Sequence, residues 1–437
     1  MKQFATIRLI VLISVVGFGA LNAGCTSVAR GVTEAMMEPS PEHDDRECFI
    51  RGRGFNGLQS QLARQSADGT GANENQNAGQ PRLKILMVHG IGSHLPGYST
   101  LLQINLAKAL NLDVVSESIK DVHILDPDNP ERTLGLLRIS RYLNSDESQE
   151  MLFYELNWSA LTEDEKESIA YDNSGEYSFQ RASFNNSMKE FLNGHLPDPL
   201  IYLGESRRDI LQLVGQSICW MISRDWDQFE DDTEGACDSH DPAIPEHLRR
   251  DDYAFVGHSL GSRIITDSME AMSEHVSHTA SDSQVARETH DILREKTFSV
   301  FMLANQLPLL QLGRKAPEVT GKIKAYCGID APLADDRALG ALNIVAFNDP
   351  NDLLSYAVPL QYLDKHMDSR LCPSLVNVQL EVAEVISIAG VGEFASPLAA
   401  HSGYQNDRRV IALIAGGLGT DFSSPMIQDR CTWLQVR

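Results

Sequence analysis

The fold is decided by one stretch of sequence, Tyr253-Ala254-Phe255-Val256-Gly257-His258-Ser259-Leu260-Gly261. Its apolar first half predicts a short buried strand, and a helical pattern begins directly after it. Glycines stand two positions before and two positions after Ser259. Small residues are needed there because the turn from strand to helix is tight and strained, and the turn raises the serine hydroxyl above the sheet. The stretch therefore predicts a G-x-S-x-G nucleophile elbow, formed by Gly257 and Gly261 around Ser259.

More buried strands are predicted on both sides of this elbow. Each is a short apolar run, and helical patterns such as 98–112 and 408–415 lie between the runs. The runs are residues 83–89, 122–125, 151–156, 298–303, 341–347 and 375–388. Strands that alternate with helices predict an α/β fold with a mostly parallel central sheet flanked by helices.

A serine nucleophile needs a base, and the base needs a group that orients it. The predicted strand 341–347 is followed by two acidic candidates for the orienting group, Asp352 and Asp349. Asp349 precedes a proline, where an aspartate also serves as a turn residue. His401 follows the last predicted strand, 49 residues after Asp352, and is the candidate base. Ser259, the acidic candidates and His401 follow one another in the order serine, acid, histidine, which is the chain order in hydrolases with a nucleophile elbow.

An oxyanion hole requires two backbone N–H groups directed at the reacting carbonyl oxygen. The residue after the nucleophile, Leu260, supplies one of them. The second is expected from the segment that ends the first clear strand, where Gly90 lets the backbone approach the substrate closely. Ile91 is the first candidate for this donor, and Gly92 is the second.

These pieces together resemble the α/β-hydrolase superfamily, and its lipase and esterase members most closely. The resemblance covers about residues 82–437. It favours Asp352 over Asp349, because Asp352 precedes two leucines as in the acid loop of many lipases. It implies that His401 acts as general base and then as general acid. Asn305 and Gln306 end another predicted strand at the same edge of the sheet, where ligands bind, and are candidate substrate contacts.

The first residues resemble a bacterial lipoprotein signal. Lys2 and Arg8 precede an apolar segment, and Leu21-Asn22-Ala23-Gly24-Cys25 resembles a lipobox. We therefore predict a signal peptide over residues 1–24 and lipidation of Cys25, with a plain secretory signal or an uncleaved anchor as alternatives. Thr26 after the cysteine, where an aspartate is absent, implies sorting to the outer membrane of a bacterial envelope. The protein would then face the periplasm or the cell surface.

The remaining chain is divided at residue 82. Residues 25–81 are poor in large apolar groups and predict a largely disordered tether, with a short amphipathic piece at 49–62 that docks on the body. Residues 82–437 predict the hydrolase domain, which contains a helical cap or lid insertion at about 160–245. Seven cysteines leave six after lipidation of Cys25, and the 15 possible pairings stay open.

Composition excludes several classes of function. The chain has 437 residues, of which 37 are basic and 60 acidic, so its formal charge is −23 and it repels phosphate backbones. We expect no nucleic-acid partner. No cysteine, histidine or acidic cluster has metal-ligand spacing, so we expect no metal and no cofactor. Apolar residues make up 42% of the chain, which is enough for a large core.

The sequence therefore predicts a membrane-tethered serine hydrolase that cleaves carboxylic esters, with an ester or lipid as substrate. Acyltransferase and thioesterase chemistry are alternatives on the same fold. A non-catalytic envelope lipoprotein is the alternative outside enzymes, and the complete set of Ser259, Asp352 and His401 argues against it. Protein partners and oligomeric state are not predicted.

Overall fold

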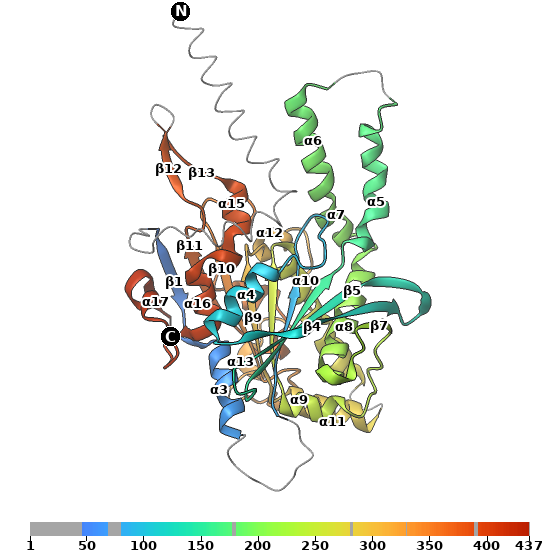
Figure 1. The fold of residues 1–437 in the computed structure, drawn as a ribbon. Helices are drawn as coiled ribbons and strands as arrows, with labels where there is room; N and C mark the ends of the chain where they lie inside the picture. Colours follow the sequence, from blue (N-terminus) through green and yellow to red (C-terminus); the bar gives the residue numbers. More distant parts are fainter. Residues whose placement is uncertain are drawn as a thin grey trace, which may run out of the picture.

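A computed structural model describes residues 46–68, 80–176, 181–279, 283–328, 330–388 and 392–436. One sheet of eleven strands crosses the molecule, in the order β15-β1-β11-β10-β9-β8-β3-β6-β5-β4-β7, with helices on both faces (Figure 1). Its strands are β1 (Cys48–Gly52), β3 (Leu83–Val88), β4 (Asp113–Asp126), β5 (Asn129–Leu143), β6 (Glu150–Asn157), β7 (Asp232–Gly235), β8 (Asp252–His258), β9 (Thr297–Leu303), β10 (Ala341–Asn348), β11 (Pro373–Leu380) and β15 (Thr432–Gln435).

The six central strands, β11, β10, β9, β8, β3 and β6, all pair in parallel. They are almost continuous apolar runs because both of their faces are covered, and all six residues of β3 are buried. This confirms the predicted α/β architecture with a mostly parallel central sheet. The chain leaves β3 on one side and returns to place β8 on its other side, so the carboxyl ends of β3 and β8 form a topological switch point.

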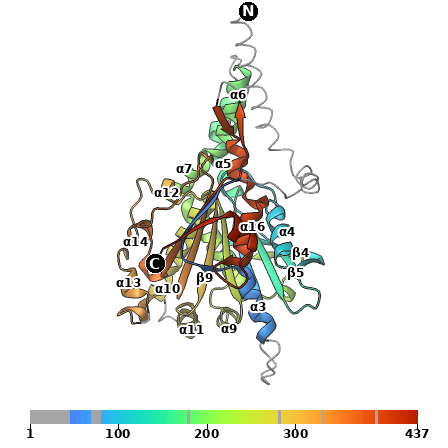
Figure 2. The ribbon, with the colours of Figure 1, turned by 90° about the vertical axis from the view of Figure 1, so that its left-hand side faces the viewer.

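Helices form two layers, one on each face of the sheet (Figure 2). The first layer packs Leu62, Leu106 and Val410 into one apolar core, and the second packs Leu213, Ile264 and Leu293 into another. The first layer contains α3 (Leu58–Asp68), α4 (Thr100–Ala109) and α16 (Arg408–Gly416), and the second contains α8 (Arg207–Ser223), α9 (Ile244–Arg250), α10 (Leu260–Thr279) and α11 (Gln284–Leu293). Short helices α12 (Leu307–Leu310), α13 (Ile323–Tyr326), α14 (Tyr362–His366), α15 (Pro397–Ser402) and α17 (Pro425–Arg430) lie in the connections.

The predicted boundary at residue 82 is wrong, because the folded body begins well before it. β1 pairs with both β11 and β15, and the buried Leu58 and Leu62 place α3 in the core. β2 (Phe55–Asn56) pairs with β14 (Gly417–Leu418) in a small second sheet. A disulfide joins Cys48 to Cys431. The docking piece expected at 49–62 is therefore part of the domain, whereas residues 1–45, including Cys25, lie outside the described residues.

The cap is smaller than the predicted insertion at 160–245. α5 (Ala160–Ala170), α6 (Ser183–His195) and α7 (Pro197–Leu203) lie at the end of the molecule where the parallel strands finish, and α5 and α6 rise above the body in both views (Figures 1 and 2). α8, in contrast, packs its apolar face on the sheet, and the disulfide Cys219–Cys237 ties it to the segment after β7. We therefore limit the cap to α5, α6 and α7.

Two other details differ from the predicted elements. The segment 375–388 is not one strand: β11 ends at Leu380, and β12 (Val385–Ile388) forms a separate hairpin with β13 (Gly392–Ala395). β5 was not predicted, because its first five residues are exposed and carry no apolar run.

A third disulfide joins Cys327 to Cys372. No helix within the described ranges has the length and apolar character needed to cross a membrane.

Candidate active site

Ser259 stands at the turn between β8 and α10 in the left-handed region of backbone space, with φ of +55°. The two elbow glycines are required by space: a Cβ on Gly257 would lie 2.7 Å from the Ser262 nitrogen, and one on Gly261 would collide with the Val88 carbonyl oxygen. The Ser259 N–H donates to the Leu303 oxygen at 2.8 Å, which fixes the strained turn to β9. The backbone therefore has the nucleophile-elbow form that the sequence predicted.

His401 brings its ring to the serine from the far end of the chain. Its Nε2 lies 3.0 Å from Ser259 Oγ. The residue lies in the short helix α15, which was not predicted, and the Ser396 side chain caps that helix by accepting from the Ala399 N–H. His258 also holds α15 in place, because its Nε2 lies 2.9 Å from the His401 carbonyl oxygen.

Asp352 completes the chain of hydrogen bonds. Its two carboxylate oxygens lie 3.0 and 2.9 Å from His401 Nδ1. Burial alone would raise the pKa of Asp352, but the hydrogen bonds that it accepts, first among them the one from His401, outweigh burial and hold the pKa below its usual value. An ionised carboxylate only accepts hydrogen bonds, so Nδ1 carries the proton and Nε2 is left free to accept the serine proton.

Asp349, the alternative acid, is used elsewhere. One of its oxygens accepts from the N–H groups of Val382 and Ala383, and the other accepts from the Asn351 N–H. Its own N–H donates to the Tyr404 hydroxyl. Asp349 therefore braces the loop after β10 against the end of β11, while Asp352 faces the histidine.

Two backbone amides are available beside Ser259. Leu260 is the first residue of α10, and N–H groups in the first turn of a helix have no acceptor within the helix. Gly90 lies against the nucleophile, since a Cβ there would be 2.6 Å from Ser259 Cβ, and Ile91 follows it. The Gly92 N–H, in contrast, donates to Asp198 Oδ2 at 2.6 Å. This corrects the expectation that Gly92 is an alternative donor.

Two histidines beside the site, the buried His89 and the half-buried His258, were not predicted to have a role. Burial and the neighbouring His401 lower the pKa of His258 to about 3, so this ring is neutral at ordinary pH. Burial likewise lowers the pKa of His89, whose ring stacks on Trp158 at 4.7 Å. Both residues occupy variable positions of their motifs, and the motifs alone do not indicate a role for them.

The candidate substrate contacts are only partly compatible with the structure. Asn305 is fully buried, and its amide group donates to the Tyr356 oxygen and accepts from the Leu307 N–H, so it braces the backbone. The expectation for Asn305 is wrong for that reason. Gln306 is buried at the start of α12, and its contact with substrate stays a prediction.

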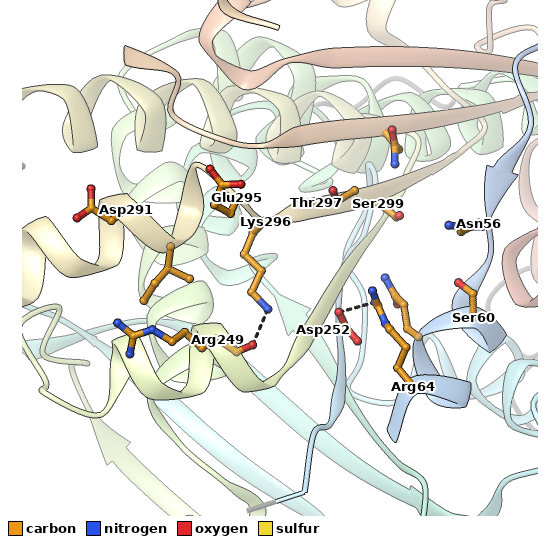
Figure 3. A pocket seen from close by; sticks show the side chains of 13 residues that line it. Asn56, Ser60, Arg64, Arg249, Asp252, Asp291, Glu295, Lys296, Thr297 and Ser299 are labelled. Atoms are coloured by element: carbon orange, nitrogen blue, oxygen red, sulfur yellow. Dashed lines mark hydrogen bonds and ion pairs between the residues drawn. The ribbon is translucent and has the colours of Figure 1, made fainter. Parts of the chain in front are cut away.

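A cavity of about 780 Å³ lies at the opposite ends of the strands (Figure 3). Most of its lining residues are polar or charged, and its charged groups are engaged: Arg64 pairs with Asp252, and Lys296 donates to the Arg249 oxygen (Figure 3). The cavity contains none of the triad residues, and we assign it no role in their chemistry. In the part of the chain that the structure describes, no group of three His, Cys, Asp or Glu side chains could hold a metal ion.

Comparison of the chain with protein-family models, with curated proteins and with solved structures finds no match. The candidate site therefore rests on its own geometry.

Proposed function

We propose that this protein is a serine hydrolase with the α/β-hydrolase fold, and that it cleaves carboxylic esters through an acyl-enzyme. One observation carries the proposal: Ser259, His401 and Asp352 form a continuous chain of hydrogen bonds of 3.0 and 2.9 Å at the switch point of a parallel sheet. A strained serine, a histidine with a free Nε2 and a buried carboxylate are what nucleophilic acyl transfer requires.

The first half-reaction forms the acyl-enzyme. His401 Nε2 takes the proton of Ser259 Oγ while that oxygen attacks the ester carbonyl carbon, and Asp352 stabilises the resulting imidazolium. The carbonyl oxygen becomes an oxyanion, which the N–H groups of Leu260 and Ile91 bind. When the tetrahedral intermediate collapses, His401 returns the proton to the leaving alkoxide and the alcohol departs.

The second half-reaction repeats these steps with water. His401 removes a proton from water, the hydroxide attacks the acyl carbon, and the bond to Ser259 Oγ breaks. The serine oxygen recovers its proton from His401, and the carboxylic acid is released. Free acid as the product distinguishes hydrolysis from acyl transfer to another alcohol.

Apolar side chains at the site favour esters with apolar acyl groups. Leu353 and Leu354 directly follow Asp352 and are 71% and 38% exposed, although leucine is usually buried. A lipid substrate would also fit the proposed location, in which an acyl chain on Cys25 holds the protein on the outer membrane of a bacterial envelope.

The proposed anchor is tested separately. Cys25→Ala should release the protein from membranes, and unchanged membrane association would refute this anchor.

The proposed chemistry is tested by labelling with a fluorophosphonate probe and by assaying a series of p-nitrophenyl esters of increasing acyl length. We expect labelling and turnover that both disappear in Ser259→Ala. Ser268→Ala is the matched control, since this serine lies on the same helix and its hydroxyl only donates to the Ile264 oxygen. Folded wild-type protein without Ser259-dependent labelling would overturn the proposal, and a steep preference for acetate esters would overturn its lipid version.

A further inference from the structure

Side chains hold several peptide groups of the loop that follows β3. The Trp158 N–H donates to His89 Nε2 at 3.2 Å, so the other ring nitrogen, Nδ1, carries the proton and donates to the Gly90 oxygen at 2.9 Å. His94 Nε2 lies 3.2 Å from the Ile91 oxygen. The Gly92 N–H donates to Asp198 at 2.6 Å. Two consecutive peptide planes are therefore fixed, by two histidines of the loop itself and by Asp198 from outside it.

This bonding determines where the Ile91 N–H points. In a trans peptide the C=O and N–H bonds point in opposite directions, so holding the Gly90 oxygen on one side directs the Ile91 N–H to the other. The next peptide plane, which contains the Ile91 oxygen and the Gly92 N–H, is held at both ends, and this restricts rotation of the plane that contains the Ile91 N–H. Ile91 N–H has no acceptor among the residues that the structure describes, and it lies in the loop that touches Ser259.

The acceptor for Gly92 comes from the cap. Asp198 lies in the first turn of α7 and is fully buried, and its other oxygen pairs with Lys166 Nζ of α5 at 2.6 Å. The ring of His195, at the end of α6, approaches to 3.0 Å of where a Cβ on Gly92 would lie. Gly92 has φ of +95°, a conformation that glycine adopts easily. α6 and α7 therefore reach Gly92 directly, and α5 reaches its partner Asp198 through Lys166.

A buried carboxylate is retained at such a place only when it is paired and hydrogen-bonded. Asp198 meets both conditions, through Lys166 and through the Gly92 N–H. We propose that Asp198 is a positioning residue for the oxyanion hole: it holds the Gly92 amide, and through it the direction of the Ile91 N–H, so the seated cap is part of the catalytic apparatus. This inference rests on the proposed esterase function and extends it to the cap.

The test compares Asp198→Ala/Lys166→Met with Asp198→Asn/Lys166→Met. Both variants remove the buried charges together, which protects folding, but only asparagine restores an oxygen that can accept from Gly92. We expect kcat to fall about 10- to 100-fold in the alanine variant with KM within about twofold, since small misplacements of catalytic donors have effects of this size. The asparagine variant should recover most of kcat. Asp172→Ala is the control: this carboxylate lies between α5 and α6, is paired with Arg181 and Lys189 away from Gly92, and its removal should change neither constant.

Two inhibitors separate positioning from general damage. A trifluoromethyl ketone forms a tetrahedral adduct with the serine whose oxyanion needs the hole, and its binding should weaken by the same factor as kcat. A non-hydrating amide analogue of the substrate reports only ground-state binding and should bind the alanine variant as it binds the wild type.

Three results would overturn the inference. These are an unchanged kcat in the alanine variant, an equal loss of binding for both inhibitors, and a gain of activity, which would mean that Asp198 blocks the hole instead of building it. Wild-type protein without Ser259-dependent turnover would instead overturn the proposed function, and this inference with it.

Discussion

The two ends of the same parallel strands carry polar groups in opposite ways. At their amino ends, Lys84 of β3 is completely buried and is bound by the Asp251 carboxylate and by the Met221 and Arg224 oxygens. Arg250 and Arg82 bind Asp251 and Asp225, and Arg82 also reaches Glu150 of β6. Each charge there has several direct partners, which offset the cost of burying it.

At the carboxyl ends the partners are fewer. Ser259 Oγ faces a single histidine, and the amides of Leu260 and Ile91 are left for a ligand. Under the proposed function this difference is a division of roles: the amino end, with all its charges paired, holds the strands together, and the carboxyl end keeps hydrogen-bonding groups for the reaction. Variants at each end should therefore separate stability from activity.

The largest expected effect is on activity at the carboxyl end. His401→Ala should lower kcat for a p-nitrophenyl ester by on the order of 10⁴- to 10⁶-fold, because the serine loses its base. The thermal midpoint should stay close to that of the wild type, since the bond from His258 goes to the backbone of this residue. The exposed His240 provides the matched control in His240→Ala. A comparable kcat in both variants would contradict the proposed triad.

The opposite pattern is expected at the amino end. Lys84→Met leaves Asp251 without its closest lysine partner and should reduce the free energy of unfolding by about 3–5 kcal/mol, measured by urea denaturation. The kcat/KM of the folded fraction should remain within about twofold. A variant that keeps its stability but loses activity would show that the two ends are not separate in function.

Asp349 and Asp352 sharpen the comparison within a single loop. Asp349→Ala removes the acceptor of three buried or half-buried amides and should cost about 3 kcal/mol of stability, with little change in kcat at a temperature where the variant is folded. Asp352→Asn should do the reverse, because it favours the wrong tautomer of His401. Measuring unfolding and kcat for both variants checks this, and a shared loss of kcat would assign Asp349 to the site.

The smallest effect concerns a carboxyl group farther along the nucleophile helix. Burial raises the pKa of Glu270 to about 8, although the Arg263 guanidinium lies 3.6 Å away. Between its ordinary pKa and about 8, the folded state holds this proton and the unfolded state does not, so stability falls as pH rises through that window. Glu270→Gln should lack this loss, and its advantage over the wild type should grow by about 1 kcal/mol per pH unit between pH 5 and 7. Parallel urea curves for the two proteins across that range would contradict the shift.

The sequence was informative wherever one local pattern decides the structure. Gly257 is required by a contact with nearby Ser262 and Gly261 by the Val88 carbonyl oxygen of the neighbouring strand, but both glycines flank Ser259 in the chain, so the elbow was visible as a motif. The central strands were visible because burial on both faces makes them apolar throughout. His401 followed from chain order, although its short helix did not.

The sequence could not decide what depends on distant pairing. Asp349 and Asp352 follow the same strand, and only the position of His401, far along the chain, separates them. β1 pairs with β15 across almost the whole length of the chain, and two of its five residues face outward, so its pattern resembled a tether. No local pattern marks Asp198, because its proposed role depends on the Gly92 amide, which only the fold brings into contact with it.

The strand β1 changes how an acylated Cys25 would act mechanically. A fully extended chain covers about 3.3–3.6 Å per residue, so the leash from Cys25 to Cys48 is at most roughly 80 Å, instead of the roughly 200 Å expected from a tether that ended near residue 82. Tension on that leash would enter the body at β1, between β11 and β15, and the bond from Cys48 to Cys431 would carry it covalently to the last strand. The load path thus runs along one margin of the sheet and spares the strands that bear Ser259.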